Sequence, residues 1–292
     1  MDRIAPWLQT HWDDRAAGNF IGGGTGSGLA IVAAATLLES GESQPAAFAL
    51  AALLIALGLG LVWLEMGRPW RFLHVFLHPH TSWMTRESLI APPLLAALGI
   101  AAWLEGAASA VAALVLSLAF LYSQSQILHA AKGIPAWREP RIVPLIMTTG
   151  IAEGAGAYLL LGAVFGMLPE SPFAIALALA AIFARSLAWS SYRRRFARGS
   201  APTGTRRALA GISLTLVMLG TFVPFVLLLA ALALPDAVNA LAPLGGLSAL
   251  AAGWWMKHAL LRRAAFNQGF AIAQPPGERS GATRAAARPG WS

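Results

Sequence analysis

The stretch AAFALAALLIALGLGLVWL, residues 46–64, is apolar from end to end. A transmembrane helix needs roughly 20 consecutive, mostly apolar residues, so this stretch predicts one membrane span. Seven more stretches share this character, namely Asn19–Thr36, Ser88–Trp103, Ala108–Leu128, Ile142–Met167, Phe173–Trp189, Ala208–Leu234 and Ala240–Met256. With Ala46–Leu64, they predict an all-α, polytopic membrane protein with eight transmembrane helices, packed as two four-helix bundles.

The composition indicates that lipid is the solvent. Of 292 residues, 57% are hydrophobic and 12% are charged, whereas soluble domains are about 25% charged. The net charge of +8 raises the alternative of nucleic-acid binding. However, the basic residues lie in short segments between apolar stretches, which is a topology pattern and argues against a nucleic-acid partner. The chain has no cysteine, so it forms no disulfide and holds no iron–sulfur cluster through thiolates.

The basic residues alternate between the connecting segments. Of the 21 lysines and arginines, all but Arg185 lie in the N-terminal segment, the second, fourth and sixth connections and the C-terminal segment. The other connections carry only acidic charges, Glu39, Glu42, Glu105, Glu170 and Asp236. Lysine and arginine resist translocation, so we expect the basic side to face the cytoplasm of a bacterial inner membrane. Both termini are then cytoplasmic, which requires an even number of spans.

Three segments follow from these boundaries. Residues 1–18 form an N-terminal segment in which Ile4, Leu8 and Trp12 are four residues apart. This spacing suits a short amphipathic helix at the membrane interface, and a disordered lead-in is the alternative. Residues 19–263 form the eight-helix membrane domain. Residues 264–292 are expected to form a cytoplasmic tail that is disordered from Gln274, because it is rich in proline, glycine, serine and arginine.

The first predicted span begins with a glycine-rich run. It contains the small-xxx-small pairs Gly22/Gly26 and Gly24/Gly28, which allow close helix approach in lipid. The spacing fits no nucleotide-binding loop. Close packing is favoured, and room for a flat ligand ring at the cytoplasmic end is the functional alternative.

Two ionisable residues lie inside predicted spans. Glu153 is near the middle of the fifth span and Arg185 is within the sixth. Such residues are costly in lipid and indicate function by default. A proton path through them and a buried structural ion pair between them both remain open.

Polar residues also gather at the cytoplasmic ends of several spans, where a quinone headgroup would need hydrogen-bond donors and a protonatable group. They include Glu65, Glu87, Tyr122 and His129. Lys257 closes the eighth span, and we expect it to be an interfacial anchor.

The histidines argue against haem, because a transmembrane haem needs facing histidines within helices. His129 and His258 lie at span ends, and the others lie outside the spans. The cluster of His74, His78 and His80 has no interleaved acid, so an amphipathic loop on the membrane is favoured over a metal site. No nucleophile, catalytic triad or phosphate-binding motif appears, and no catalytic residue is expected in this chain.

Two neighbouring motifs carry a family resemblance. Leu64–Pro69 (LEMGRP) followed by Ser82–Glu87 (SWMTRE) resembles the loop signature of the dimethyl sulfoxide reductase membrane-anchor family (DmsC), which is related to the NrfD and polysulfide reductase anchors. The segment Ala130–Trp137 (AAKGIPAW) is also similar. The length and the eight spans agree, so the resemblance covers nearly the whole chain.

The resemblance implies a membrane-anchor subunit of a molybdopterin/iron–sulfur oxidoreductase, either non-catalytic or quinone-reactive. Such anchors lie under a four-cluster iron–sulfur subunit, which binds a molybdopterin catalytic subunit. They exchange electrons and protons with menaquinone or ubiquinone near the membrane surface. With its loops on the cytoplasmic side, the chain resembles the sulfite dehydrogenase and phenylacetyl-CoA:acceptor oxidoreductase arrangements.

The resemblance also implies site residues. In the family, an acid at the start of the third helix is linked to quinol binding, and the matching position is Glu87. A histidine often precedes the Gly-Arg-Pro motif, and Glu65 is the nearest residue here, which is a departure from the pattern. Asn19 matches a polar position near the start of the first helix. The residues expected to face the partner subunit are Arg68, Pro69 and Arg86.

Two rival functions use the same residues differently. A proton-coupled secondary transporter would use Glu153, but such transporters more often have pseudo-symmetric halves and broken helices. A purely structural anchor would turn its polar residues towards a partner and bind no quinone.

Overall fold

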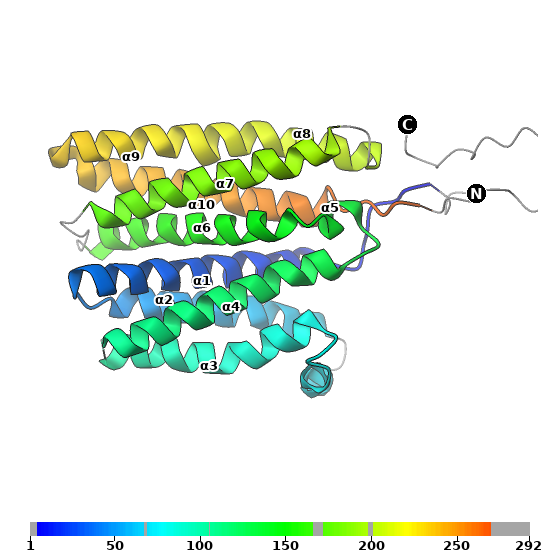
Figure 1. The fold of residues 1–292 in the computed structure, drawn as a ribbon, viewed down its shortest axis with the longest axis horizontal. Coiled ribbons are helices and arrows are strands. Elements are labelled where there is room, and N and C mark those ends of the chain that lie inside the picture. Colours follow the sequence, from blue (N-terminus) through cyan, green and yellow to red (C-terminus); the bar gives the residue numbers. More distant parts are fainter. Residues whose placement is uncertain (1–4, 67–68, 105, 166–171, 198–200, 270–292) are drawn as a thin grey trace, which may run out of the picture.

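Eight helices in the structure, a computed structural model, are long and apolar enough to cross a membrane. The structure describes residues 5–66, 69–104, 106–165, 172–197 and 201–269. The spans are α1 (Asp14–Ser40), α2 (Pro45–Glu65), α3 (Trp83–Leu104), α4 (Ala107–Ala130), α6 (Ile142–Phe165), α7 (Phe173–Phe196), the continuous pair α8 (Thr203–Val217) and α9 (Val223–Ala233), and α10 (Val238–Arg262). Their long axes run roughly side by side (Figure 1). The predicted all-α membrane fold with eight spans is confirmed.

Shorter elements join the spans. The helix η1 (Pro69–Leu77) lies between α2 and α3, and α5 (Pro135–Arg138) lies between α4 and α6. The π-helical turn η2 (Met218–Phe222) joins α8 to α9, and η3 (Pro235–Ala237) precedes α10.

The spans pack as two four-helix bundles. In the first, α1 and α3 each contact both α2 and α4. In the second, α6 and α9 each contact both α7 and α10. The bundles meet mainly where α1 lies against α6, which places α1 at the centre of the molecule (Figure 1).

Glycines allow α1 to approach its neighbours closely. A Cβ atom on Gly28 would overlap the backbone at Gly150 of α6, and one on Gly154 would overlap Gly28. On another face of α1, Cβ atoms on Gly22 and Gly26 would lie 2.7 Å from backbone carbonyls of α2. Close helix packing, the favoured interpretation of the glycine run, is therefore confirmed at these positions.

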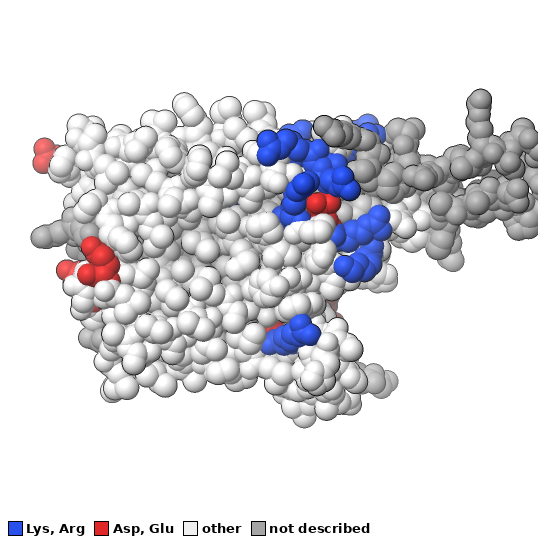
Figure 2. Space-filling view, in the orientation of Figure 1, with Lys and Arg blue, Asp and Glu red and all other residues white. Residues whose placement is uncertain are grey.

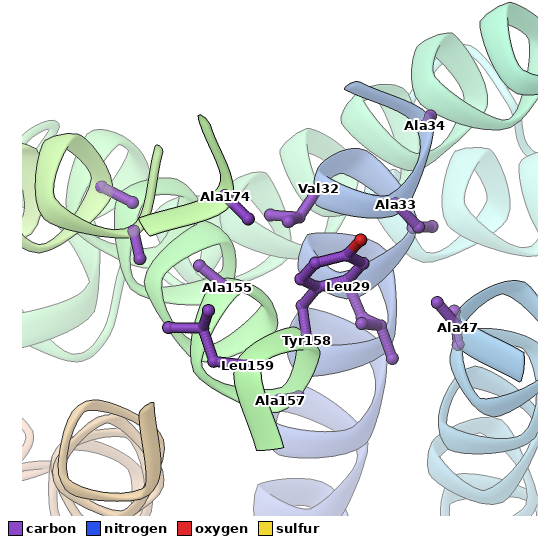
Figure 3. Packing of buried hydrophobic residues seen from close by; sticks show 14 of the residues in the cluster. Leu29, Val32, Ala33, Ala34, Ala47, Ala155, Ala157, Tyr158, Leu159 and Ala174 are labelled. Carbon is purple, nitrogen blue, oxygen red and sulfur yellow. The ribbon is translucent and has the colours of Figure 1, made fainter. Parts of the chain in front are cut away.

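Small residues continue this packing beyond the glycines. Figure 3 shows Val32 of α1 on the side that faces Ala155 of α6, and Ala33 on the side that faces Ala47 of α2. Without water to drive helices together in lipid, such close van der Waals contact supplies much of the association energy.

Charge separates the two ends of the molecule. Figure 2 shows lysine and arginine gathered at one end, which is also the end where α1 begins and α10 ends in Figure 1. We call this the basic end. Acidic side chains mark the opposite end, where the α1–α2 connection with Glu39 and Glu42 lies.

Asp13 caps the start of α1, which lies at the basic end. The Asp13 carboxylate accepts a hydrogen bond from the backbone N–H of Arg15 at 2.8 Å and forms an ion pair with the Arg15 guanidinium at 2.7 Å. A capping acid satisfies an N–H group that has no partner within the helix. The Arg15 side chain also holds the pKa of Asp13 below its ordinary value.

The two terminal segments pair with each other. Leu8 and Phe266 form an antiparallel bridge, and the backbone N–H of Gln9 donates to the carbonyl of Ala265 at 3.0 Å. Residues 5–13 form no helix, and the predicted amphipathic helix is therefore wrong for this part of residues 1–18. Of the expected tail, residues 264–269 belong to this ordered pairing, whereas the stretch from Gln274 lies outside the described residues.

Candidate functional site

A pocket of about 680 Å³ opens at the basic end of the first bundle. Its walls come from the N-terminal segment, α1, α2, η1, α3 and α4, and most of its side chains are apolar. The lining residues are Trp12, Ala16, Asn19, Phe20, Leu59, Gly60, Val62, Trp63, Glu65, Met66, Phe72, Val75, Phe76, Met84, Glu87, Ser88, Ala91, Pro92, Leu95 and Ile127. Its volume lies within the roughly 300–1,000 Å³ typical of small-molecule sites. An apolar wall with few polar groups is also typical of such sites.

The mouth of the pocket lies on the outer surface of the bundle. Trp63, Phe72 and Met84 line it and are 45%, 39% and 44% exposed. These three residues belong to α2, η1 and α3. A ligand with an apolar tail could therefore enter from the side between these elements.

Three of the predicted quinone-binding residues meet in this pocket. Asn19 comes from α1, Glu65 from the last turn of α2, and Glu87 from the first turns of α3. Three helices that are separate in sequence thus place polar groups in one apolar cavity.

Glu87 is the most enclosed acid of the pocket, since the residue is 6% exposed. The side-chain amides of Gln124 and Asn19 lie against its carboxyl group. Within the part of the chain that the structure describes, Glu87 Oε1 and Asn19 Oδ1 have no hydrogen-bond partner. Other buried side chains, Glu153 among them, also have such an atom, and Glu87 and Asn19 differ from these in lining the pocket, where a ligand could meet them.

The other two predicted quinone-binding residues, Tyr122 and His129, do not line the pocket. The Tyr122 hydroxyl accepts a hydrogen bond from Gln126 at 2.7 Å, and its ring packs edge-on against Trp83. His129 lies in the last turn of α4. Residues two apart on a helix point to nearly opposite sides, so Gln124, which is fully buried on another face of α4 than Tyr122, takes the position near Glu87.

The loop predicted to dock a partner is described in part. Arg68 lies outside the described residues, and Pro69 is the first residue of η1. Arg86 donates to the carbonyls of Pro79 and His80 at 2.8 and 3.0 Å and stacks over the Trp83 ring. Arg86 thereby holds the connection between η1 and α3 in place.

The element η1 presents an apolar outer face. Trp70, Leu73 and Leu77 are 78%, 59% and 62% exposed. This exposure fits the predicted amphipathic segment on the membrane surface, since aromatic and aliphatic side chains prefer that interface.

A second cluster of polar groups lies between the bundles. Lys257 of α10 donates to Glu153 Oε2 of α6 at 2.6 Å, and both side chains are fully buried. The same Glu153 oxygen accepts from the Thr25 hydroxyl of α1 at 2.9 Å, and Trp254 donates to Thr25 at 2.9 Å. Lys257 also donates to the carbonyl of Phe20 at 3.0 Å. The predicted interfacial role of Lys257 is wrong, because α10 continues to Arg262 and the lysine side chain turns into the protein.

Arg185 lies close to this pair without bonding to it. Its guanidinium donates to the carbonyl of Ala249 at 2.9 Å and to that of Gly220. Gly220 belongs to the π-helical turn η2, where the regular helical hydrogen bonds are interrupted. The buried ion pair therefore joins Glu153 to Lys257 instead of Arg185, and the three side chains together carry two cations and one anion.

The sequence analysis missed Lys257 and Gln124 as site residues. Both are polar residues near a helix end, which is also the ordinary place for interfacial side chains. Among the described residues, no group of three histidines and acids could hold a metal ion.

Comparison of the sequence with models of known protein families and with curated proteins gives no match.

Proposed function

We propose that the protein binds a quinone at the basic end of its first bundle and serves as the membrane-anchor subunit of a molybdopterin/iron–sulfur oxidoreductase. The observation that carries the quinone assignment is the pocket, which combines an apolar wall, a mouth on the outer surface of the bundle and polar side chains from three helices. A quinone has the matching shape of an apolar tail with a ring that bears two hydrogen-bonding oxygens.

The polar groups of the pocket suit the two redox forms differently. An ionised Glu87 accepts a hydrogen bond from a quinol hydroxyl, and a protonated Glu87 donates one to a quinone carbonyl. Glu87 is thereby the group that exchanges a proton with the ligand. Asn19 and Glu65 provide further polar contacts along the same wall.

The partner subunits and the orientation are part of the proposal. The loop motifs around Gly67 and Arg86 support docking of a four-cluster iron–sulfur subunit that passes electrons to or from a molybdopterin subunit. The distribution of basic residues supports a cytoplasmic location for this end and both termini. A reporter enzyme that is active only outside the cytoplasm should be inactive when fused to the C-terminus, and strong activity would overturn the orientation.

Quinone binding can be tested by fluorescence, because Trp12 and Trp63 line the pocket. We expect a short-chain ubiquinone to quench the tryptophan fluorescence of the full-length protein in lipid nanodiscs, with saturation. Ala91→Phe fills the pocket and should abolish saturable quenching. Ala112→Phe is the matched control, because Ala112 faces outward on α4. Identical quenching in both variants would overturn the proposed site.

The anchor assignment can be tested by purification from the native membrane in a mild detergent. An iron–sulfur subunit and a molybdopterin subunit should accompany the tagged protein. We expect Glu87→Gln to leave this assembly intact while quinone-linked turnover falls. Recovery of the folded protein alone would overturn the anchor assignment.

A proton-coupled transporter is the second candidate, and the buried Glu153–Lys257 pair favours it. A transporter would move a solute into proteoliposomes when a pH gradient is applied. No quinone or partner subunit would be needed for that flux.

A further inference from the structure

The buried pair and the pocket are joined by one polar side chain, Gln124 of α4. Its Nε2 donates to the carbonyl of Asn19 at 3.0 Å, and its amide lies against the Glu87 carboxyl. Gln124 is fully buried, and its Oε1 has no partner among the described residues. The Oε1 atom of Gln124 is therefore free to accept a hydrogen bond.

Two glycines of α1 leave the space that brings Gln124 near Lys257. A Cβ atom on Gly23 would overlap the Gln124 amide nitrogen, and one on Gly24 would overlap Lys257 Nζ. The same Gly24 position lies 3.7 Å from Gln124 Oε1. Lys257 Nζ and Gln124 Oε1 thus both lie beside Gly24, without a direct hydrogen bond between them.

The charges around Lys257 allow it to lose a proton. The charged groups that face it are Glu153 on α6 and Arg185 on α7, and the carbonyl of Phe20 on α1 also accepts from it. With Lys257 charged, the cluster has a net charge of +1 in a low-dielectric interior, which is costly. With Lys257 neutral, Glu153 and Arg185 balance each other.

The pocket supplies a reason for this proton to move. A quinone carbonyl only accepts hydrogen bonds, so it meets a protonated Glu87 more favourably than an ionised one, beside the N–H and O–H groups of Asn19 and Ser88. The unpartnered atoms Glu87 Oε1 and Asn19 Oδ1 are acceptors, and an ionised Glu87 cannot meet a carbonyl favourably. Glu65, the other acid of the pocket, also only accepts hydrogen bonds when it is ionised.

We propose that Lys257 is the internal proton donor for the pocket and acts through Gln124 and the space left by Gly23 and Gly24. When oxidised quinone binds, an N–H bond of the Lys257 ammonium breaks and an O–H bond forms on the Glu87 carboxylate. Lys257 becomes a neutral amine, Glu87 becomes a donor to the quinone carbonyl, and no proton is exchanged with bulk water. The inference rests on the proposed quinone site.

The test is the pH dependence of ubiquinone affinity, measured by the fluorescence titration between pH 7 and 9. An internal donor makes the affinity of the natural protein independent of pH, since bound and free states hold the same number of protons. In Lys257→Met the proton must come from water, so affinity should fall by about tenfold per pH unit. Lys257→Met keeps Glu153 and Arg185 balanced, so we expect it to fold.

Two matched variants complete the test. Lys132→Met removes a lysine from the connection between α4 and α5 and should remain independent of pH. Glu87→Gln carries its own N–H donor and should also be independent of pH. Should Lys257→Met fail to fold, Gln124→Leu should give the same tenfold slope, because it removes the amide through which the proton is proposed to pass.

Each outcome decides one point. Affinity of the natural protein that falls with pH as steeply as that of Lys257→Met would overturn the internal donor and leave the quinone site standing. Equal, flat profiles in all variants would also overturn it. Absence of saturable binding in the natural protein would overturn the proposed function itself.

Discussion

Two buried carboxylates of this protein have opposite surroundings. Glu153 lies between the bundles, where Lys257 and Thr25 bond to its carboxylate and the charge of Arg185 lies nearby. These neighbours favour the ionised form. Glu87 lies at the edge of a cavity, where its carboxyl group faces two amides. Each carboxylate keeps one oxygen without a partner among the described residues, so the contrast lies in the paired cation of Glu153 and the cavity beside Glu87. The first surroundings hold a charge in place, and the second leave a group available to a ligand. Burial alone therefore does not indicate function, and the partners of each carboxylate distinguish the two cases.

The largest expected effect comes from removing the two charges in turn. Glu153→Gln leaves Lys257 and Arg185 as two buried cations and should lower the free energy of unfolding by roughly 3–5 kcal/mol. Glu87→Gln keeps size and hydrogen bonding and should cost about 1 kcal/mol or less. Thermal unfolding in nanodiscs measures both. Equal losses of stability would break the comparison.

A smaller loss of stability is expected when Glu153 loses the hydrogen bond from Thr25. Thr25→Val keeps the shape of the side chain but removes the hydroxyl that donates to Glu153 and accepts from Trp254. Leaving buried groups without their partner costs about 1–3 kcal/mol each. The control is Thr148→Val, because the Thr148 hydroxyl donates only to carbonyls of its own helix, at 2.7 and 3.3 Å. Similar melting temperatures for the two variants would mean that Thr25 does not support the pair.

The smallest effects separate glycines that have a role from one that has none. A Cβ atom on Gly99 would meet nothing within 4 Å, so Gly99→Ala should stabilise α3 by about 0.5–1 kcal/mol through helix propensity alone. Gly24→Ala would crowd Lys257, so the gain should be cancelled or reversed. A gain in both variants, measured by thermal unfolding, would show that Gly24 does not hold the lysine in position.

The sequence was sufficient for the spans and for part of the site. The eight apolar stretches predicted the eight helices, and the alternation of charged connections supported an even number of spans, because topology depends on composition over long stretches. Asn19, Glu65 and Glu87 line one pocket because each lies near the end of its helix that is at the basic end of the bundle. Such placement needs only the direction of each span.

The remaining errors concern which face of a helix a residue occupies and which distant segment it meets. Tyr122 and Gln124 are two residues apart on α4, and only the packing against α1 decides which of them lies near Glu87. Lys257 was misjudged because a lysine near a helix end resembles an anchor until the partner on α6 is known. The paired N-terminal segment depends on Phe266, which lies at the other end of the chain.

That last pairing has a consequence for biosynthesis. Gln9 bonds to carbonyls of Leu261 and Ala265, and Arg262 bonds to the carbonyl of Trp12. These partners leave the ribosome only after the eighth span has been made. Gln9 and Trp12 can therefore form these bonds only after every helix has been inserted. The part of the pocket wall that Trp12 provides forms late in assembly.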